Sequence, residues 1–170
     1  MSAKPYLFLD VDGVLNAPYP AWPSTLRVPI VDHPKLPQGV VLTLSYSPEM
    51  VAAIKDLEVE LVWLTTWEDS AQTHLVPLIN ALGGNIYLSS AGHVKLSDYT
   101  GLWKYSALRE FVEAHPRPFI WVYDDAISSR AERDLVTLDV AHLLVRPYPK
   151  QGITPNHVAL IKEFLCSLLP

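Results

Sequence analysis

Short apolar runs alternate along the chain with longer segments whose apolar residues recur at helical spacing. Runs of four to eight apolar residues bounded by turn residues are typical of buried strands, and helices between them are typical of parallel sheets. The pattern therefore predicts an α/β fold, a Rossmann-like three-layer sandwich with a central, mostly parallel sheet. The expected strands are residues 6–11, 59–64, 85–88, 119–123 and 141–145.

Helices are expected at 48–57, at 68–82, at 103–114 and after Thr154. Ser47 and Thr154 are suited to cap the first and the last, because each is followed by a proline that fits the first helical turn. The apolar stretch 158–169 places an apolar face on the last helix, and Cys166 within it is expected to pack in the core.

Prolines are concentrated in one part of the chain, since seven of the fifteen fall between Pro18 and Pro48. This segment has no helical period, and a structureless loop of that length is uncommon. We expect a small proline-rich flap insertion at 17–47 within a single catalytic domain spanning 1–170. Its strands would be 26–31 and 40–44, paired as a hairpin around a turn that contains Gly39.

Composition and charge narrow the classes of partner. With 170 residues and 49% hydrophobic content the chain can bury a substantial core. A formal net charge of -5 disfavours extensive binding to duplex nucleic acid or to an anionic membrane. The first apolar run is too short for a signal peptide, no run could span a membrane, and the single cysteine suits a reducing compartment. We therefore expect a cytoplasmic protein, with no indication of its oligomeric state.

The sharpest feature is the string FLDVDGVLN at 8–16, in which Asp10 and Asp12 follow the first strand and precede Gly13. Ligands of open α/β sheets gather beyond the carboxyl ends of the strands. A solvated turn after a strand is the structural alternative. The strands at 59–64 and 119–123 end in Thr65-Thr66 and Asp124-Asp125.

Lys104 opens a later helix, so four carboxylates, a hydroxyl and an ammonium could meet at one edge of the sheet. Taken separately, Thr65 could be a helix cap, Lys104 a surface lysine and Asp124-Asp125 a capping pair. Clustered carboxylates repel one another unless a hard cation lies among them, and all-oxygen ligation favours Mg²⁺. No paired histidines or cysteines indicate zinc.

In this order, the motifs resemble those of the haloacid dehalogenase-like (HAD) phosphohydrolase superfamily. Asp10, Asp12 and Gly13 match its first motif, and Thr65 its second, with Thr66 as the other register. Lys104 matches the third, with Lys95 as the alternative, and Asp124 and Asp125 match the fourth. The string WLTTW at 63–67 is similar to the small HAD domains associated with RNA repair systems.

The resemblance implies that Asp10 is the nucleophile of a phosphatase and forms an aspartyl-phosphate. Asp12 would protonate the leaving group and then activate water, while Thr65 and Lys104 would hold the phosphoryl oxygens. The implied Mg²⁺ ligands are Asp10, Asp124, Asp125 and the main-chain carbonyl of Asp12. A phosphotransferase, or a catalytically silent module that binds a phosphorylated ligand, is the alternative function.

No segment leaves room for a large cap, so the site could admit a small metabolite, a phosphoprotein or, as we prefer, a nucleotide or nucleic-acid end. Gly13, Arg27, Thr66 and Trp67 are the candidate substrate-binding residues. Further candidates are three aromatic or imidazole side chains, whose alternative is packing or an ordinary surface position: Trp22, His33 and Trp103. A basic group in the last third would add weight to a polynucleotide if it lay at the pocket mouth, and is otherwise a solvated face: Arg130, Arg133, Arg146 and Lys150.

Overall fold

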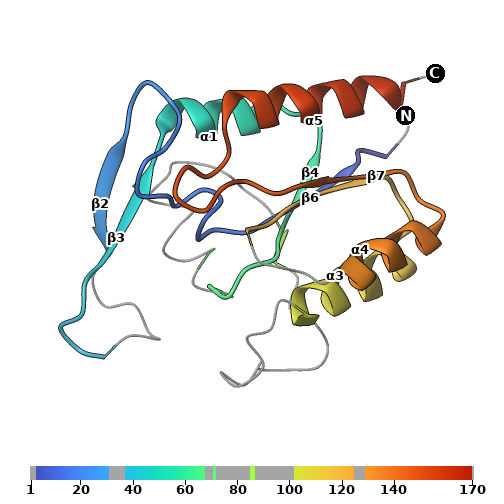
Figure 1. The fold of residues 1–170 in the computed structure, drawn as a ribbon, viewed down its shortest axis with the longest axis horizontal. Helices are drawn as coiled ribbons and strands as arrows, with labels where there is room; N and C mark the ends of the chain where they lie inside the picture. The colour runs from blue at the N-terminus through green and yellow to red at the C-terminus, as the bar shows by residue number, and fades with distance from the viewer. Residues whose placement is uncertain are drawn as a thin grey trace.

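The computed structural model describes residues 3–30, 37–67, 71, 85–86, 102–124 and 129–169. Its main sheet has five strands in the order β5-β4-β1-β6-β7, and all the neighbouring strands pair in parallel (Figure 1). This confirms the predicted α/β class. The strands are β1 (Tyr6–Leu9), β4 (Glu60–Trp63), β5 (Asn85–Ile86), β6 (Phe119–Val122) and β7 (His142–Val145).

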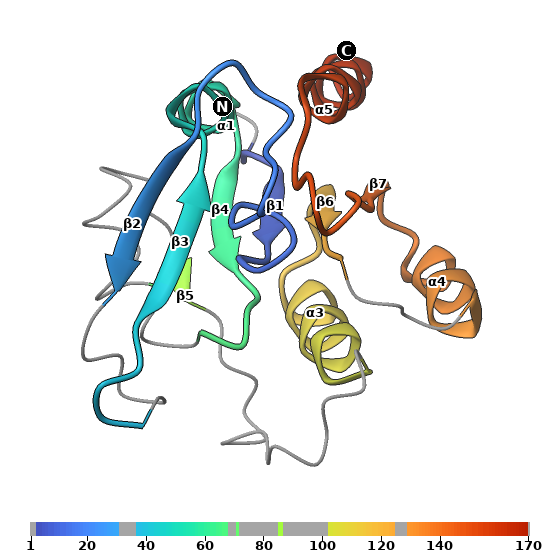
Figure 2. The same ribbon diagram turned by 60° about the vertical axis from the view of Figure 1, so that its left-hand side comes forward.

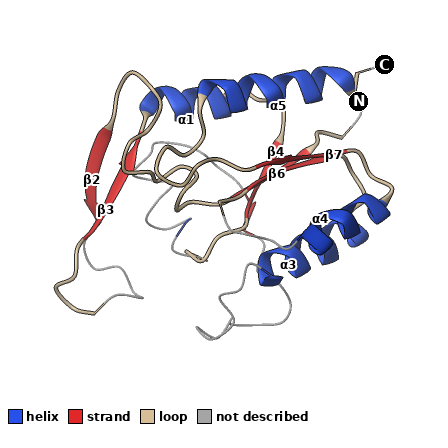
Figure 3. Cartoon of the chain, viewed as in Figure 1, coloured by secondary structure: helices blue, strands red, loops and turns tan. Residues whose placement is uncertain are grey.

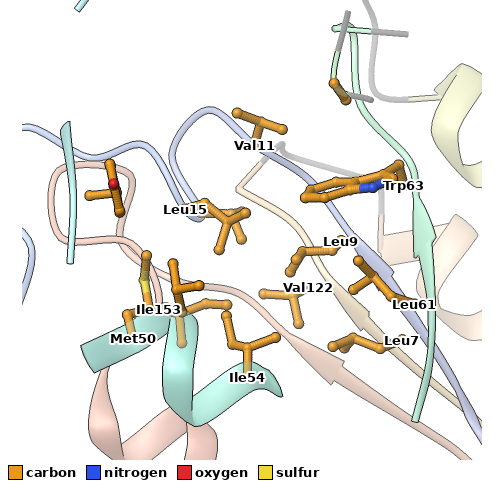
Figure 4. Close-up of a cluster of buried hydrophobic side chains, with 14 of the residues drawn as sticks. Leu7, Leu9, Val11, Leu15, Met50, Ile54, Leu61, Trp63, Val122 and Ile153 are labelled. Carbon is orange, nitrogen blue, oxygen red and sulfur yellow. The ribbon is translucent and has the colours of Figure 1, made fainter. Parts of the chain in front are cut away.

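Alternating side chains of the strands build a separate core on each face of the sheet. In β1, Leu7 and Leu9 belong to one core, and Tyr6 and Phe8 to the other. The first core is closed by α1 (Pro48–Lys55) and α5 (Pro155–Ser167), and the second by α3 (Leu102–Ala114) and α4 (Ser129–Leu135). Figures 1 and 3 show the resulting three layers, and Figure 4 shows residues of α1 packed beneath β1 and β4.

The predicted helix starts at Ser47 and Thr154 are confirmed. The hydroxyl of Ser47 accepts a hydrogen bond from the amide of Met50, and that of Thr154 accepts one from the amide of His157, both at 3.3 Å. These bonds satisfy donors that the first turn of a helix leaves free. The helix expected at 68–82 lies outside the described residues. Within that range the structure describes only Ala71, which is buried.

The proline-rich segment contains the expected hairpin, formed by β2 (Leu26–Ile30) and β3 (Leu42–Tyr46). Its second strand begins two residues later than predicted, because the turn extends further. The amide of Val40 donates to the carbonyl of Pro37 at 3.0 Å, and Gly39 has a φ of 84° that favours glycine. Figure 2 shows the end of β2 and the start of β3 on the side toward which β4 points.

In the last third of the chain, one expectation needs correction and one helix was not expected. Cys166 is exposed rather than packed in the core, because α5 turns only the face that carries Val158 and Ile161 inward. The short helix α4 was not predicted, because its sequence SRAERDL buries only Ala131 and Leu135. No helix in the described part of the chain is long and apolar enough to cross a membrane.

Candidate active site

The ends of three neighbouring strands bring the predicted site residues to one edge of the sheet. Strand β1 lies between β4 and β6, and Leu9 is in register with both Trp63 and Val122. Asp10 directly follows Leu9. Thr65 stands two residues after Trp63, and Asp124 stands two residues after Val122. The backbone continues the pairing there, since the amide of Asp10 donates to the carbonyl of Val122 at 3.3 Å. The clustering predicted from the strand ends is therefore present for these three residues.

Asp10 is buried, with 2% of its surface exposed, and both of its carboxylate oxygens have partners. Oδ1 accepts a hydrogen bond from the amide of Val11 at 2.7 Å, and Oδ2 forms an ion pair with the ammonium of Lys104. Burial raises the pKa of Asp10 from 3.8 to about 6, and the positive charge of Lys104 opposes that rise. A buried carboxylate that is held at both oxygens is fixed in orientation, as a nucleophile needs to be.

Lys104 reaches Asp10 from the first turns of α3. It is only 3% exposed, since it lies on the same side of the helix as the buried Ala107 and Leu108. Burying an ammonium is costly unless a partner compensates it, and here the compensating charge is Asp10. This position excludes the alternative of a solvated surface lysine. Lys95, the alternative for the third motif, lies outside the described residues.

Gly13 allows Asp124 to lie directly against the turn that follows β1. Its φ is 71°, and a Cβ added at this position would come within 2.1 Å of Asp124 Oδ2 and 2.8 Å of Asp124 Cβ. The negative charge of Asp124 also contributes to raising the pKa of Asp10, although less than burial does. The two carboxylates therefore share one electrostatic environment. Asp125 lies outside the described residues.

Two side chains from different segments hold the carboxylate of Asp12. Asn16 Nδ2 donates to Oδ1 at 2.7 Å, and the indole N–H of Trp67 donates to Oδ2 at 2.8 Å. Asp12 itself is exposed, whereas Trp67 is buried, with 5% of its surface exposed. Trp67 was expected to contact substrate, and the structure makes it a partner of Asp12 instead of a free stacking surface.

Sequence reasoning missed Asn16, although it closes the FLDVDGVLN string four residues after Asp12. The amide of Gly13 donates to the carbonyl of Asn16 at 2.9 Å, so the segment between them forms a compact turn. Asn and Asp are both common in turns, where their short polar side chains form local hydrogen bonds. That spacing was the signal available in the sequence.

Thr65 is buried at the end of β4, with 4% of its surface exposed, and its hydroxyl accepts a hydrogen bond from the amide of Trp67 at 3.3 Å. This bond orders the turn that carries the Trp67 indole to Asp12. Thr66, the alternative register of the second motif, is half-buried. Thr65 follows Leu64, whose amide donates to the carbonyl of Leu9 at 3.0 Å, so its backbone lies at the same sheet edge as Asp10.

The donors in this cluster fit a hard cation. The carboxylates of Asp10 and Asp124 share the site, and the main-chain carbonyl of Asp12 belongs to the same turn. Mg²⁺ is commonly held by one or two carboxylates and keeps several waters. Within the described ranges no group of three or more His, Cys, Asp or Glu side chains is gathered around a common point. The oxygen donors that are described are of the kind that Mg²⁺ accepts.

The remaining candidate contacts divide between packing and surface. Trp22 packs against the first core, and its indole N–H donates to the carbonyl of Ile153 at 2.6 Å. Trp103 packs against the second core, so both tryptophans follow the packing alternative. Arg27 is exposed on β2. His33 and the side chain of Arg130 lie outside the described residues, and the rest of the basic group is exposed: Arg133, Arg146 and Lys150.

Comparison with known proteins agrees with the motifs and the geometry. The sequence profile of the family described as "HAD domain in Swiss Army Knife RNA repair proteins" matches residues 6–158. Searches of curated proteins and of solved structures found no significant match. The matched range includes every motif position placed above, from Asp10 to Asp124, and spans most of the chain. The chain therefore belongs to this HAD domain family, which indicates a phosphohydrolase-type domain.

Proposed function

We propose that this protein is a Mg²⁺-dependent phosphatase that hydrolyses a phosphomonoester through an aspartyl-phosphate at Asp10. The observation that carries the proposal is the buried Asp10 carboxylate, paired with Lys104 and close to Asp124, at the carboxyl end of the central strand. A buried acid that shares its site with a second carboxylate and a buried lysine has no evident structural purpose at a strand end. Perturbed ionisable groups of this kind are concentrated at functional sites.

In the first step, an oxygen of Asp10 attacks phosphorus and the bond between phosphorus and the leaving-group oxygen breaks. Asp12 gives its proton to that oxygen, so that a neutral alcohol departs. In the second step, Asp12 accepts a proton from a water molecule as the water oxygen attacks phosphorus. The bond from phosphorus to Asp10 then breaks, which releases phosphate and restores the carboxylate. The exposed position of Asp12 supports both exchanges.

Lys104 and Thr65 stabilise charge in this scheme. The ammonium of Lys104 holds Asp10 in the free enzyme and neutralises phosphoryl oxygens when substrate binds. Thr65 donates its hydroxyl to the same oxygens. When bound by Asp10, Asp124, Asp125 and the carbonyl of Asp12, Mg²⁺ offsets the repulsion between the anionic nucleophile and the anionic substrate. Gly13 and Thr66 lie beside the phosphoryl group in this proposal.

The substrate that we favour is a nucleotide or a terminal phosphate of a nucleic acid. The family is described by its presence in RNA repair proteins, which supports a phosphate on a nucleic acid as the substrate. Residues 1–170 act as one cytoplasmic catalytic domain, and the hairpin within 17–47 acts as a small flap beside the site. Because the sequence leaves no room for a large cap, the site would be accessible to a polymer end.

The proposal is tested by release of phosphate from an aryl phosphate with Mg²⁺ present. The substitution Asp10→Asn removes the nucleophile and should abolish turnover while circular dichroism shows an intact fold. Asp56→Asn is the matched control, since Asp56 is an exposed aspartate that follows α1. Addition of EDTA should stop the wild-type reaction, and added Mg²⁺ should restore it. Full activity of the Asp10 variant, or undiminished activity in EDTA, would overturn the proposal.

A further inference from the structure

A pocket of about 450 Å³ lies between the turn after β1 and the β2-β3 hairpin. Its size is in the range of small-ligand sites. It is separate from the phosphoryl-transfer residues, but it shares one wall with them. Its lining residues are Asn16, Pro18, Tyr19, Arg27, Thr43 and Ser45.

The hairpin register explains why polar side chains line this pocket. Arg27 pairs directly with Ser45 across the two strands, and Thr43 lies two residues before Ser45 on the same face of the hairpin. The opposite face carries Ile30 and Leu44, which are buried in the first core. The hairpin is therefore fixed to the core by one face and presents a polar face to the pocket.

Asn16 connects the pocket to the catalytic site. Its amide nitrogen donates to Asp12 Oδ1 at 2.7 Å, and its amide oxygen accepts from the backbone amide of Ser45 at 2.8 Å. Asp12 is the residue that protonates the leaving group in the proposed function. The part of the substrate immediately beyond the leaving oxygen would therefore reach the wall formed by Asn16 and could enter the pocket.

The chemistry of the pocket fits an anion joined to a planar group. Arg27 is exposed and forms no ion pair with any acidic residue in the described part of the chain. The ring of Tyr19 is available for stacking, since 68% of the residue is exposed. Ser45 pairs with Arg27 across the hairpin, so the guanidinium and the small polar side chains lie on one wall of the pocket.

We infer that this pocket binds the nucleotide next to the terminal phosphate, with Arg27 paired to its phosphodiester and Tyr19 stacked on its base. The inference rests on the proposed function and names its substrate class, which is the end of a single-stranded oligonucleotide. A guanidinium matches a phosphodiester in geometry as well as in charge. A mononucleotide lacks that phosphodiester, and a phosphopeptide need not carry an anion next to its phosphate, so neither uses Arg27 in this way.

The test compares wild type, Arg27→Gln and a control on oligonucleotides phosphorylated at the 5′ or the 3′ end, a mononucleotide, a phosphopeptide and an aryl phosphate. The control is Lys162→Gln, which removes one exposed positive charge from α5. For Arg27→Gln, the ratio of kcat/KM on the better oligonucleotide to kcat/KM on the aryl phosphate should fall about 10- to 100-fold. For that oligonucleotide, the slope of log kcat/KM against log salt concentration should become shallower by about 0.7. The control should change neither quantity.

The inference is overturned if that ratio stays constant, if the mononucleotide shows the same dependence on Arg27, or if only the phosphopeptide shows it. Failure of the proposed function would look different, because wild type would then hydrolyse none of the substrates. In that case fluorescence anisotropy with a labelled phosphorylated oligonucleotide still tests the pocket. Binding about 10-fold weaker in Arg27→Gln than in wild type would support it, and equal binding would overturn it.

Discussion

Asp12 illustrates how neighbouring side chains prepare a residue for its role. Its carboxylate receives one hydrogen bond from Asn16 within its own turn and another from Trp67, which follows a different strand. The indole is buried and therefore rigid, while the carboxylate that it holds is exposed to solvent. This arrangement fixes the orientation of the proposed general acid and leaves it open to the leaving group and to water.

The substitution Trp67→Phe tests this positioning role because it removes the indole N–H and retains an aromatic ring. We expect kcat to fall about 10-fold on alkyl phosphates, whose leaving groups need a proton, and less on p-nitrophenyl phosphate, whose leaving group does not. Trp121→Phe is the matched control, since the Trp121 N–H has no hydrogen-bond partner among the described residues. An equal loss on both kinds of substrate would indicate a merely structural role for Trp67.

The contact between Gly13 and Asp124 gives a second prediction at this scale. In Gly13→Ala, the new methyl group meets the whole side chain of Asp124, so the carboxylate has to move away from Asp10. We expect at least a 10-fold rise in the Mg²⁺ concentration that gives half-maximal phosphatase activity, as for other disturbed ligand positions. Gly39→Ala has a similar positive φ with no atom within 4 Å, so it isolates the backbone strain. Equal behaviour of the two variants would contradict the proposed place of Asp124.

The start of helix α5 is set by residues that are close together in the sequence, and the helix then packs Val158 and Ile161 in the first core. Thr154 and His157 form a capping box, in which the Thr154 amide donates to His157 Nδ1 at 3.1 Å. That acceptor requires an imidazole that is unprotonated at Nδ1. Burial lowers the pKa of His157 below its ordinary value of 6.5, in agreement with a neutral ring in the fold.

This cap makes part of the stability depend on pH. Since the pKa of His157 is lower in the folded state than in the unfolded state, its contribution is complete above pH 6.5 and is lost as the pH falls below it. In His157→Gln, the amide oxygen can accept the same bond without titrating. Urea unfolding measures the free energy of unfolding at pH 7 and at pH 5. Between these two values, the free energy of unfolding should fall more for wild type than for this variant, by up to about 1 kcal/mol. Equal drops would show that the cap does not titrate.

At the scale of the whole molecule, the sequence predicted the parts that follow from periodicity and from parallel topology. Asp10, Thr65 and Asp124 meet because parallel strands end at one edge, and that rule needs only the strands. The partnership of Trp67 with Asp12 could not be predicted, because it depends on the turn between Thr65 and Trp67. The polar pocket could not be predicted either, since the strand β3 starts later than expected and only its register places Ser45 opposite Arg27.

The carboxylate cluster also gives a prediction for the intact protein. Any ion that binds the folded state alone stabilises it, so Mg²⁺ should raise the melting temperature of the wild type in the absence of substrate. Asp124→Asn should lose that rise. Glu58→Gln should retain it, because Glu58 is an exposed acid paired with Lys4. Differential scanning calorimetry with and without Mg²⁺ measures the effect, and the same rise in all three proteins would place the ion elsewhere.

The central proposal is transfer of a phosphoryl group to Asp10, and trapping the covalent intermediate tests it most directly. Wild-type protein is mixed with substrate and Mg²⁺, the reaction is quenched with acid within milliseconds, and the peptides are mapped by mass spectrometry. We expect one added phosphoryl group, located on Asp10 and missing from Asp10→Asn. A phosphoryl group on another residue, or turnover in which no labelled peptide forms, would contradict the assignment of Asp10 as the nucleophile.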